Sequence, residues 1–258
     1  MMDLANKVIL ITGASSGFGE LIARTCAARG ARLVLAARSL PALEQLAADL
    51  GGPTYAVAVA ADVTDDAAVT QLAAHALRSF GRVDVLVNNA GFGVLDTMAD
   101  ARLSDLQAMM DVNVYGALRC TRVLLPHMRA RGSGQIVMMA SMAGSITSPG
   151  LGQYCATKHA LVALSRTLTT ELDGSGIRVA MICPGVAQTG FQQRADPAKF
   201  SRISKLSATT AEAVATVTAD AIARGLHGEV VVPWYGRLML FAGQLSPWMT
   251  RKISRIVG

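Results

Sequence analysis

The sequence contains little charge, and the charge is not concentrated anywhere. Of its 258 residues, 16% are Asp, Glu, Lys or Arg and 52% are hydrophobic. This composition excludes a disordered chain and predicts one large domain with a sizeable core. Basic residues exceed acidic ones by 24 to 18, a net charge of +6, but no block of consecutive Lys or Arg marks a nucleic-acid face. A small anionic ligand explains the excess as well as any other partner.

Cysteine is scarce as well, and the four that are present form no C-x-x-C pair. Such wide spacing fits small buried thiols in a reducing compartment better than a disulfide framework, so we expect a cytoplasmic protein. The four histidines have neither metal-ligand nor triad spacing, and no metal site is expected. The cysteines are Cys26, Cys120, Cys155 and Cys183.

Long hydrophobic runs are missing. No stretch reaches the ~18 uninterrupted apolar residues of a membrane-spanning helix. The N-terminus also lacks the charged-then-apolar layout of a signal peptide, so the short run from Val8 to Ile11 is interpreted as a first strand. No second domain, internal repeat or low-complexity linker is visible.

Short apolar runs instead alternate with helical stripes. The longest helical pattern covers residues 104–131, another begins at Tyr154, and Thr209 and Glu212 form a capping box before a helix over residues 213–224. This alternation predicts an α/β fold: a single doubly wound (Rossmann) domain with a mainly parallel seven-stranded sheet flanked by helices. The expected strands cover residues 7–12, 32–37, 54–60, 84–88, 135–141, 176–183 and 229–233.

The first strand runs into a glycine-rich turn, Thr12-Gly13-Ala14-Ser15-Ser16-Gly17-Phe18-Gly19, and a helical stripe follows. Glycines let the backbone approach a phosphate, and the free N–H groups of a helix N-terminus favour anions. The spacing differs from the G-x-G-x-x-G of many dinucleotide sites, and a flexible turn is the alternative. The strand before it and the helix after it favour phosphate binding.

The residues after the second strand indicate which dinucleotide is bound. An acidic residue there would accept hydrogen bonds from a free ribose 2′-hydroxyl, but this chain has Ala37 followed by Arg38, which can pair with a 2′-phosphate. NADP(H) is therefore the expected cofactor, and a solvated Arg38 is the alternative. Asp62, just past the third strand, could bond an adenine amino group or act as a helix N-terminal acid.

Tyr154 and Lys158 form a pair that could act in proton transfer. Residues four apart share one face of a helix, so the ammonium of Lys158 would lie beneath the phenol of Tyr154 and favour its ionisation. For a Tyr to ionise near pH 7, its pKa must fall by about three units, which corresponds to roughly 4 kcal/mol. An exposed helical pair is the alternative. Ser141, at the end of the fifth strand, reaches the same crevice mouth, and Asn113 is an unfavourable residue inside a helix.

With these residues in place, the chain resembles the short-chain dehydrogenase/reductase family from Lys7 to about Pro233. The resemblance rests on five elements in the family's order and spacing. They are Thr12 to Gly19, Asn88 to Gly91, Ser141, Tyr154 with Lys158, and Pro184-Gly185.

The resemblance implies a role for each site residue. Tyr154 would be the general acid in reduction, Lys158 would lower its pKa and hold the nicotinamide ribose, Ser141 would orient the substrate carbonyl, and Asn113 would hold a water on the proton path. The expected cofactor contacts are Thr12, Gly13, Ser15, Ser16, Gly17, Phe18, Gly19, Arg38, Asp62, Val63, Asn89, Ala90, Gly91, Tyr154, Lys158, Pro184, Gly185, Ala187 and Thr189.

Two segments depart from the family's common pattern. The resemblance implies that residues 190–207 cover the substrate within the catalytic domain, residues 1–233, but their sequence does not identify a ligand. The expected assembly is a homodimer or a homotetramer. Residues 234–258 put the tetramer in doubt, because an apolar and basic extension replaces the glycine-rich end of the family's tetrameric reductases. This extension suits packing over the substrate crevice or a subunit interface, or lying on an anionic membrane surface. Packing on the same domain is the favoured interpretation.

The resulting hypothesis is an NADPH-dependent reductase of a hydrophobic ketone or aldehyde, or the reverse alcohol dehydrogenase. One alternative is a 3-oxoacyl-[acyl-carrier-protein] reductase, whose acidic carrier could be attracted by a group of arginines. Another is a catalytically silent NADP-binding sensor or scaffold, which the intact Ser141, Tyr154 and Lys158 disfavour. The arginines are Arg119, Arg122, Arg129 and Arg166, and a solvated helix face is the simpler interpretation of them.

Overall fold

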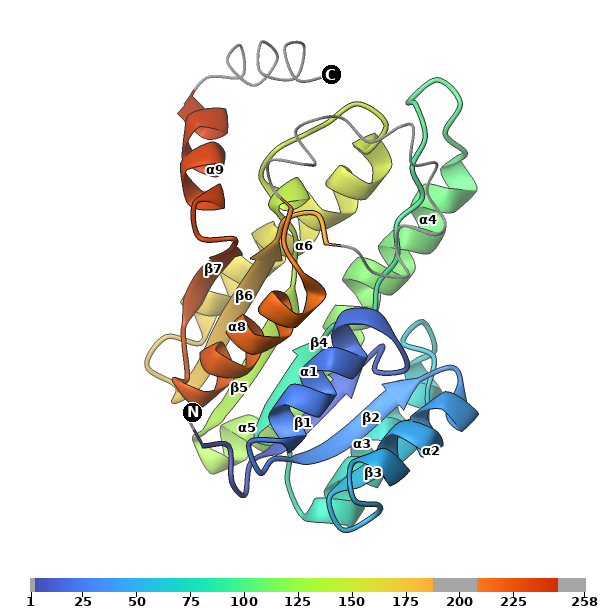
Figure 1. Ribbon diagram of the computed structural model, residues 1–258, viewed down its shortest axis with the longest axis vertical. Helices are drawn as coiled ribbons and strands as arrows, with labels where there is room; N and C mark the ends of the chain where they lie inside the picture. Colours follow the sequence, from blue (N-terminus) through green and yellow to red (C-terminus); the bar gives the residue numbers. More distant parts are fainter. Residues whose placement is uncertain (1–2, 188–207, 246–258) are drawn as a thin grey trace.

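A computed structural model describes residues 3–187 and 208–245 (Figure 1). Its seven strands form one sheet in the order β3-β2-β1-β4-β5-β6-β7, and every neighbouring pair is parallel. The predicted doubly wound parallel sheet is therefore confirmed. The strands are β1 (Val8–Thr12), β2 (Arg32–Ala37), β3 (Ala56–Ala60), β4 (Val85–Asn88), β5 (Gly134–Met139), β6 (Ile177–Pro184) and β7 (Gly228–Val232).

Helices connect the strands and cover both faces of the sheet. Those on one face are α1 (Gly17–Ala27), α2 (Leu40–Asp49) and α8 (Ala211–Ala223), and those on the other are α3 (Asp66–Phe80), α5 (Ala117–Arg131) and α6 (Gly152–Glu171). The remaining helical elements are α4 (Leu103–Met110), the π-helical η1 (Asp111–Gly116), the 3-10 turn η2 (Met142–Gly144) and α9 (Gly236–Leu245).

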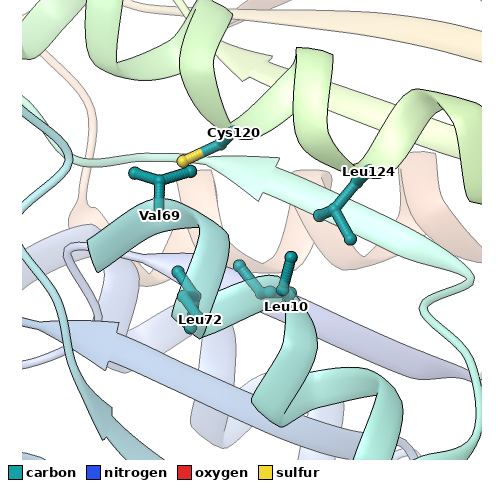
Figure 2. Close-up of a pocket in the computed structure, with 6 residues that line it drawn as sticks. Leu10, Val69, Leu72, Cys120 and Leu124 are labelled. Atoms are coloured by element: carbon teal, nitrogen blue, oxygen red, sulfur yellow. The ribbon is translucent and has the colours of Figure 1, made fainter. Parts of the chain in front are cut away.

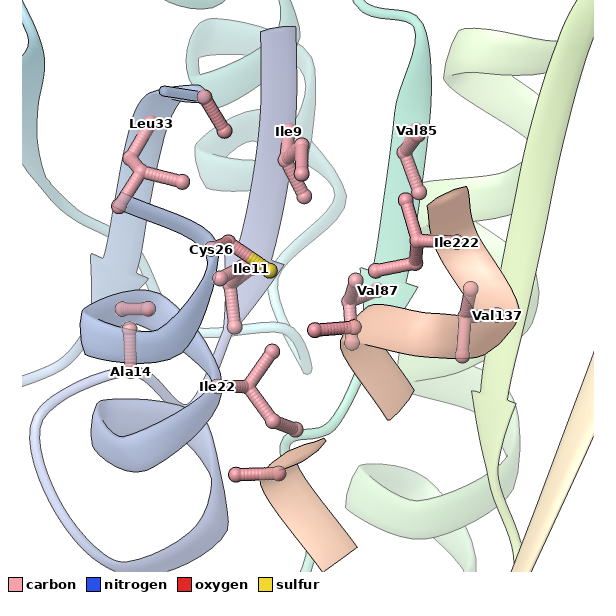
Figure 3. Packing of buried hydrophobic residues seen from close by; sticks show 14 of the residues in the cluster. Ile9, Ile11, Ala14, Ile22, Cys26, Leu33, Val85, Val87, Val137 and Ile222 are labelled. Atoms are coloured by element: carbon pink, nitrogen blue, oxygen red, sulfur yellow. The ribbon is translucent and has the colours of Figure 1, made fainter. Parts of the chain in front are cut away.

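The core consists of one hydrophobic layer on each side of the sheet. In one layer, Ile22 and Cys26 of α1 and Ile222 of α8 pack against Ile9 and Val137 from the strands (Figure 3). The strands consist largely of Val, Ile, Leu and Ala, which suit a sheet that is covered on both faces. Burial of these two layers fixes the sheet and thereby the ends of its strands, where the site lies.

The buried carboxylate of Asp84 connects the N-terminal ends of β1 and β4. Asp84 accepts hydrogen bonds from the N–H of Val8 (2.9 Å) and the guanidinium groups of Arg82 (3.0 Å) and Arg131 (2.6 Å). Burial acts to raise the pKa of Asp84, but these donors outweigh it and hold the pKa below its usual range. The residue expected to begin the fourth strand therefore precedes it and connects three segments of the chain.

The expected helical region over residues 104–131 is present, and its middle turn is the π-helical η1, which contains Asn113 and joins α4 to α5 without a break. The expected capping box was wrong. The N-cap of α8 is Thr210, whose hydroxyl accepts the N–H of Ala213, while Thr209 pairs with Ala187 in an isolated bridge. Thr209 is held by backbone pairing and cannot also cap the helix.

A gap in the second core layer, between α3 and α5, is part of the core rather than a ligand site (Figure 2). It is lined only by apolar side chains and one thiol, so no polar group is available to orient a ligand. Burial raises the pKa of that thiol, Cys120, to about 12, which keeps it protonated and unreactive. The lining residues are Leu10, Val69, Leu72, Ala73, Cys120 and Leu124.

Candidate active site

The candidate site lies at the carboxyl ends of β1 and β4. From β1 the chain proceeds outward through β2 to β3, and from β4 it proceeds in the opposite direction through β5 and β6 to β7. Ligands of open parallel sheets bind at this reversal of direction. The glycine turn, the end of β4, Ser141 after β5 and the start of α6 meet in this region.

The glycine turn fits closely under the end of β4. Gly13 has a φ of 65°, and a Cβ there would lie 2.8 Å from Ala90 Cα. A Cβ at Gly19 would collide with Gly13 O and lie 2.6 Å from Asn89 Nδ2. Only glycine satisfies both positions, because the φ is left-handed at one and the space is filled at the other. The turn is therefore a rigid cradle rather than a flexible loop.

Asn89 and Thr12 hold this cradle in place. Asn89 Nδ2 donates to the carbonyls of Thr12 (2.9 Å) and Gly13 (3.1 Å). Thr12 Oγ1 accepts the N–H groups of Asn89 and Ala90, both at 3.0 Å. The side chains expected to contact a cofactor thus first serve to connect β1 to β4.

Two serine hydroxyls without hydrogen-bond partners among the described residues lie at the N-terminus of α1. Gly17 has a φ of 58°, and Ser16, the exposed N-cap, makes no side-chain capping hydrogen bond. Within the described residues the hydroxyl of Ser15 has no hydrogen-bond partner either. A phosphate would fit here, because free hydroxyls and the N–H groups of an 11-residue helix point toward the same place.

Arg38 lies beyond the end of β2 and is exposed. Within residues 3–187 and 208–245 it makes no hydrogen bond or ion pair. Ser39, the N-cap of α2, makes no side-chain capping hydrogen bond. Asp62 is different, because its carboxylate accepts the N–H (2.9 Å) and the hydroxyl (2.8 Å) of Thr64. The N–H of Thr64 is the main cause of the lowered pKa of Asp62, which stays ionised.

Lys158 is buried close to Tyr154, as the spacing of four residues predicted. Its ammonium donates to the carbonyl of Met139 (2.8 Å) and lies 5.8 Å from the centre of the Tyr154 ring. Burial lowers the pKa of Lys158 to about 8, so it remains largely protonated at neutral pH. The Met139 carbonyl, at the end of β5, is a partner that no sequence pattern indicated.

Ser141 and Tyr154 are joined directly. The hydroxyl of Ser141 accepts the N–H of Ala143 (3.1 Å), lies 3.4 Å from the carbonyl of Pro184 and is hydrogen-bonded to the phenol of Tyr154. Burial raises the pKa of that phenol, and the Ser141 hydrogen bond opposes the shift only in part. The phenol is therefore protonated at neutral pH and can donate a proton.

Asn113 has its side chain fully occupied by the protein. Its Oδ1 accepts the N–H of Phe92 (2.9 Å), and its Nδ2 donates to the Phe92 carbonyl (2.9 Å) and to Thr157 Oγ1 (3.1 Å). The amide thus links the loop after β4 to α6. The expected role of Asn113 in holding a water on the proton path stays a prediction.

The structure also gives the positions of the other expected cofactor contacts. Gly91 abuts Asn113 Oδ1, Phe18 packs against the core from α1, and the side chain of Val63 is buried against Gly116. Pro184 ends β6, Gly185 donates to the Val232 carbonyl (2.7 Å), and Ala187 is buried. Thr189 and residues 190–207 lie outside the described residues.

An apolar rim, Met98 with Leu103, lies beside the start of α6 and was not foreseen. Both side chains are exposed, and Met98 Sδ is in contact range of Gly152, two residues before Tyr154. Gln153 ties this region to α4 by donating to the Arg102 carbonyl (3.0 Å). Long connecting loops carry no periodicity, so only the exposure of these side chains in the structure reveals them.

Fold and site together define a doubly wound α/β protein in which the phenol of Tyr154 is hydrogen-bonded to Ser141 near the carboxyl ends of the strands. The chain matches the family model described as short chain dehydrogenase over residues 7–199. It therefore belongs to the short-chain dehydrogenase family and is an oxidoreductase of that family.

Individual relatives support this assignment. The chain is 44% identical over 191 residues to oxidoreductase UcpA of Escherichia coli (strain K12), covering 73% of this chain and 72% of UcpA. It is 35% identical to the ketoacyl reductase HetN of Nostoc sp., covering 100% of this chain and 91% of HetN. A crystal structure of a short-chain dehydrogenase/reductase from Burkholderia phymatum in complex with NAD matches with a TM-score of 0.84 at 30% identity, covering 96% of each chain.

Proposed function

We propose that this protein is an NADPH-dependent reductase of apolar ketones or aldehydes. The observation that carries the proposal is the arrangement of three side chains: the phenol of Tyr154 is hydrogen-bonded to Ser141 and lies close to the buried ammonium of Lys158. A nicotinamide cofactor would supply the hydride in this reaction. The glycine cradle with Ser15 and Ser16 would hold its pyrophosphate, and Lys158 its nicotinamide ribose.

The chain's own residues would handle the proton and orient the substrate. Ser141 would donate to the carbonyl oxygen, and Tyr154 would protonate that oxygen as negative charge develops on it. Lys158 would stabilise the phenolate left behind, since its ammonium lies 5.8 Å from the ring centre.

The unpaired Arg38 supports NADPH over NADH. At the end of β2 the guanidinium of Arg38 makes no hydrogen bond or ion pair with a described residue, and the hydroxyl of Ser39 makes no capping hydrogen bond. Position 37, before Arg38, is an alanine rather than an acidic residue. A 2′-phosphate would form charge-assisted hydrogen bonds there. The Burkholderia relative was crystallised with NAD, so family membership alone does not decide the cofactor.

The apolar rim supports a hydrophobic substrate. Met98 and Leu103 are 71% and 74% exposed, and they lie at the N-terminal end of the helix that carries Tyr154. An apolar group attached to the carbonyl would cover both side chains and remove their surface from water.

A carrier-protein substrate receives less support from the surface. HetN is named a ketoacyl reductase, but two of the four arginines expected to attract an acidic carrier are already paired. Arg119 binds Asp66 and Asp111, and Arg166 binds Glu229. Arg122 and Arg129 are exposed and form no ion pair within the described part of the chain.

The direct test is NADPH oxidation by the purified protein with a panel of carbonyl compounds. We expect faster turnover of bulky apolar ketones than of small polar ones, and at least equal efficiency on a free ketone and on the same chain attached to acyl carrier protein. Exclusive use of the carrier-bound chain would favour the carrier reductase. NADPH binding without any turnover would favour a silent sensor.

Replacing Arg38 with Ala should weaken NADPH binding by about ten- to a hundredfold, because it removes a charge-assisted contact worth roughly 1.5 to 3 kcal/mol. NADH binding should change little, since NADH lacks the 2′-phosphate. Cofactor affinities measured by fluorescence titration would show this difference.

Arg32→Ala provides the matched control, because Arg32 is exposed at the opposite end of the same strand. Its replacement should leave both affinities unchanged. Equal losses of NADPH and NADH binding in the Arg38 variant would contradict the assignment of Arg38 to the 2′-phosphate.

A further inference from the structure

Of the side chains that the structure describes in helix α9, Leu240 packs on the rest of the protein, and the helix backbone approaches it at Gly236. A Cβ at Gly236 would lie 2.9 Å from Met142 Sδ and 3.0 Å from Val231 Cγ1, so the helix backbone approaches η2 and β7 closely. Leu240 is buried in the same cluster as Met142 and Val231. Figure 1 shows α9 at the edge of the molecule, next to the last strand of the sheet.

An exposed apolar stripe runs from the turn before α9 onto the helix: Trp234 precedes the helix, and Leu238 and Phe241 lie on it. These side chains are 76%, 68% and 63% exposed, and the spacing of three residues places Leu238 and Phe241 on one face of the helix. Tyr235 packs edge-on against Trp234, and Arg237, which is also exposed, is the one charged residue of the helix. Single exposed apolar residues are ordinary, but a contiguous stripe of this kind marks an interaction surface.

The charge of the C-terminal sequence limits what can cover this stripe. Residues 234–258 contain Arg237, Arg251, Lys252 and Arg255 and no Asp or Glu, so they contribute +4 of the chain's net charge of +6. A second copy docking through the same surface would bring the Arg237 side chains of the two copies together, which like-charge repulsion disfavours. An anionic surface would gain about 1 kcal/mol for each Lys or Arg placed near it.

The direction of the stripe argues against a lid over the substrate. Gly236 and Leu240 face Met142, which follows the site residue Ser141, whereas the side chains of Leu238 and Phe241 are exposed away from that contact. Trp and Tyr are also the residues that settle at the boundary between lipid headgroups and acyl chains.

We propose that the stripe of Trp234, Leu238 and Phe241, with Arg237, binds an anionic lipid surface. The apolar side chains would enter the headgroup boundary, and the basic residues would remain among the phosphates. In the described part of the chain no helix is long and apolar enough to cross a membrane, so the contact is with one surface of the bilayer. The enzyme would thereby work beside the compartment in which apolar carbonyl compounds dissolve.

The test is co-sedimentation of the full-length protein with vesicles. The wild type should pellet with vesicles of equimolar phosphatidylglycerol and phosphatidylcholine at low salt, and much less with phosphatidylcholine alone. The triple variant Trp234→Ser, Leu238→Ser, Phe241→Ser should bind the anionic vesicles at least about tenfold more weakly, because its apolar anchor is lost. Arg237→Glu, which leaves every apolar side chain in place, should also weaken binding.

The double variant Leu40→Ser, Tyr55→Ser is the control, because both residues are exposed apolar positions away from α9. It should bind like the wild type. Wild-type binding by the triple variant and by Arg237→Glu would overturn the proposal. Failure of the wild type to pellet would also overturn it. If the triple variant differed from the wild type only in oligomeric mass, the stripe would be an interface with a second copy. If it differed only in the KM for ketones, the stripe would be a substrate lid.

Discussion

Replacing Tyr154 with Phe is expected to lower kcat by about a thousandfold, the usual size of a general acid's contribution. The change removes one oxygen and keeps the ring that packs at the start of α6. NADPH affinity should stay within about twofold, because the phosphate cradle and Lys158 are untouched. Steady-state NADPH oxidation and a separate binding titration would measure the two effects independently.

The local structure limits the side effects of this substitution. Ser141 loses one of its partners but keeps the N–H of Ala143 and its position near the Pro184 carbonyl. Tyr55→Phe is the matched control, since that phenol is exposed and distant in the chain, and it should have no effect on kcat. Near-wild-type turnover in the Tyr154 variant would end the proposed proton transfer.

The fold could be predicted from the sequence because the strands are short runs of apolar residues separated by long helical stripes. Runs such as Leu33 to Ala36 have no polar position, which suits only a strand covered on both faces. Once the strands were parallel, their carboxyl ends had to share one edge of the sheet. The sequence alone therefore predicts that the glycine turn, Ser141 and Tyr154 lie close together at that edge.

The details that could not be predicted depend on contacts between distant segments. Asn113 indicates an irregular helix, but its bonds to Phe92 and Thr157 require the packed structure. In α9, residues 238–241 are four apolar residues in succession, so spacing does not determine which of them faces inward. In the structure Leu238 and Phe241 are exposed, whereas Leu240 is buried.

Lys158 carries the second large expected effect. Lys158→Met should reduce both kcat and NADPH affinity by at least about a hundredfold, because the ammonium that would stabilise the phenolate and hold the nicotinamide ribose is removed. This joint loss distinguishes Lys158 from Tyr154, whose variant should retain its affinity. Loss of turnover with unchanged cofactor affinity would contradict the assignment of Lys158 to the ribose.

The same variant should make the cofactor-free protein more stable at neutral pH. Because burial lowers the pKa of Lys158 to about 8, the folded chain holds this proton less tightly than the unfolded chain does. With an unfolded pKa of ~10.4, the buried ammonium lowers the free energy of unfolding of the wild type by roughly 3 kcal/mol at pH 7. The variant avoids this cost but loses the hydrogen bond to Met139, which is worth about 1 kcal/mol.

The cost is fully present below the folded pKa and disappears as the pH rises toward the unfolded value. The variant's advantage in free energy of unfolding should therefore be about 2 kcal/mol at pH 7 and close to zero at pH 10. Urea unfolding of both proteins at the two pH values would measure it, and titrations common to both proteins cancel in the difference. An advantage of the same size at both pH values would show that better packing of Met, and not relief of a buried charge, is the cause. A less stable variant at pH 7 would show that the ammonium is held by bonds that more than offset its burial.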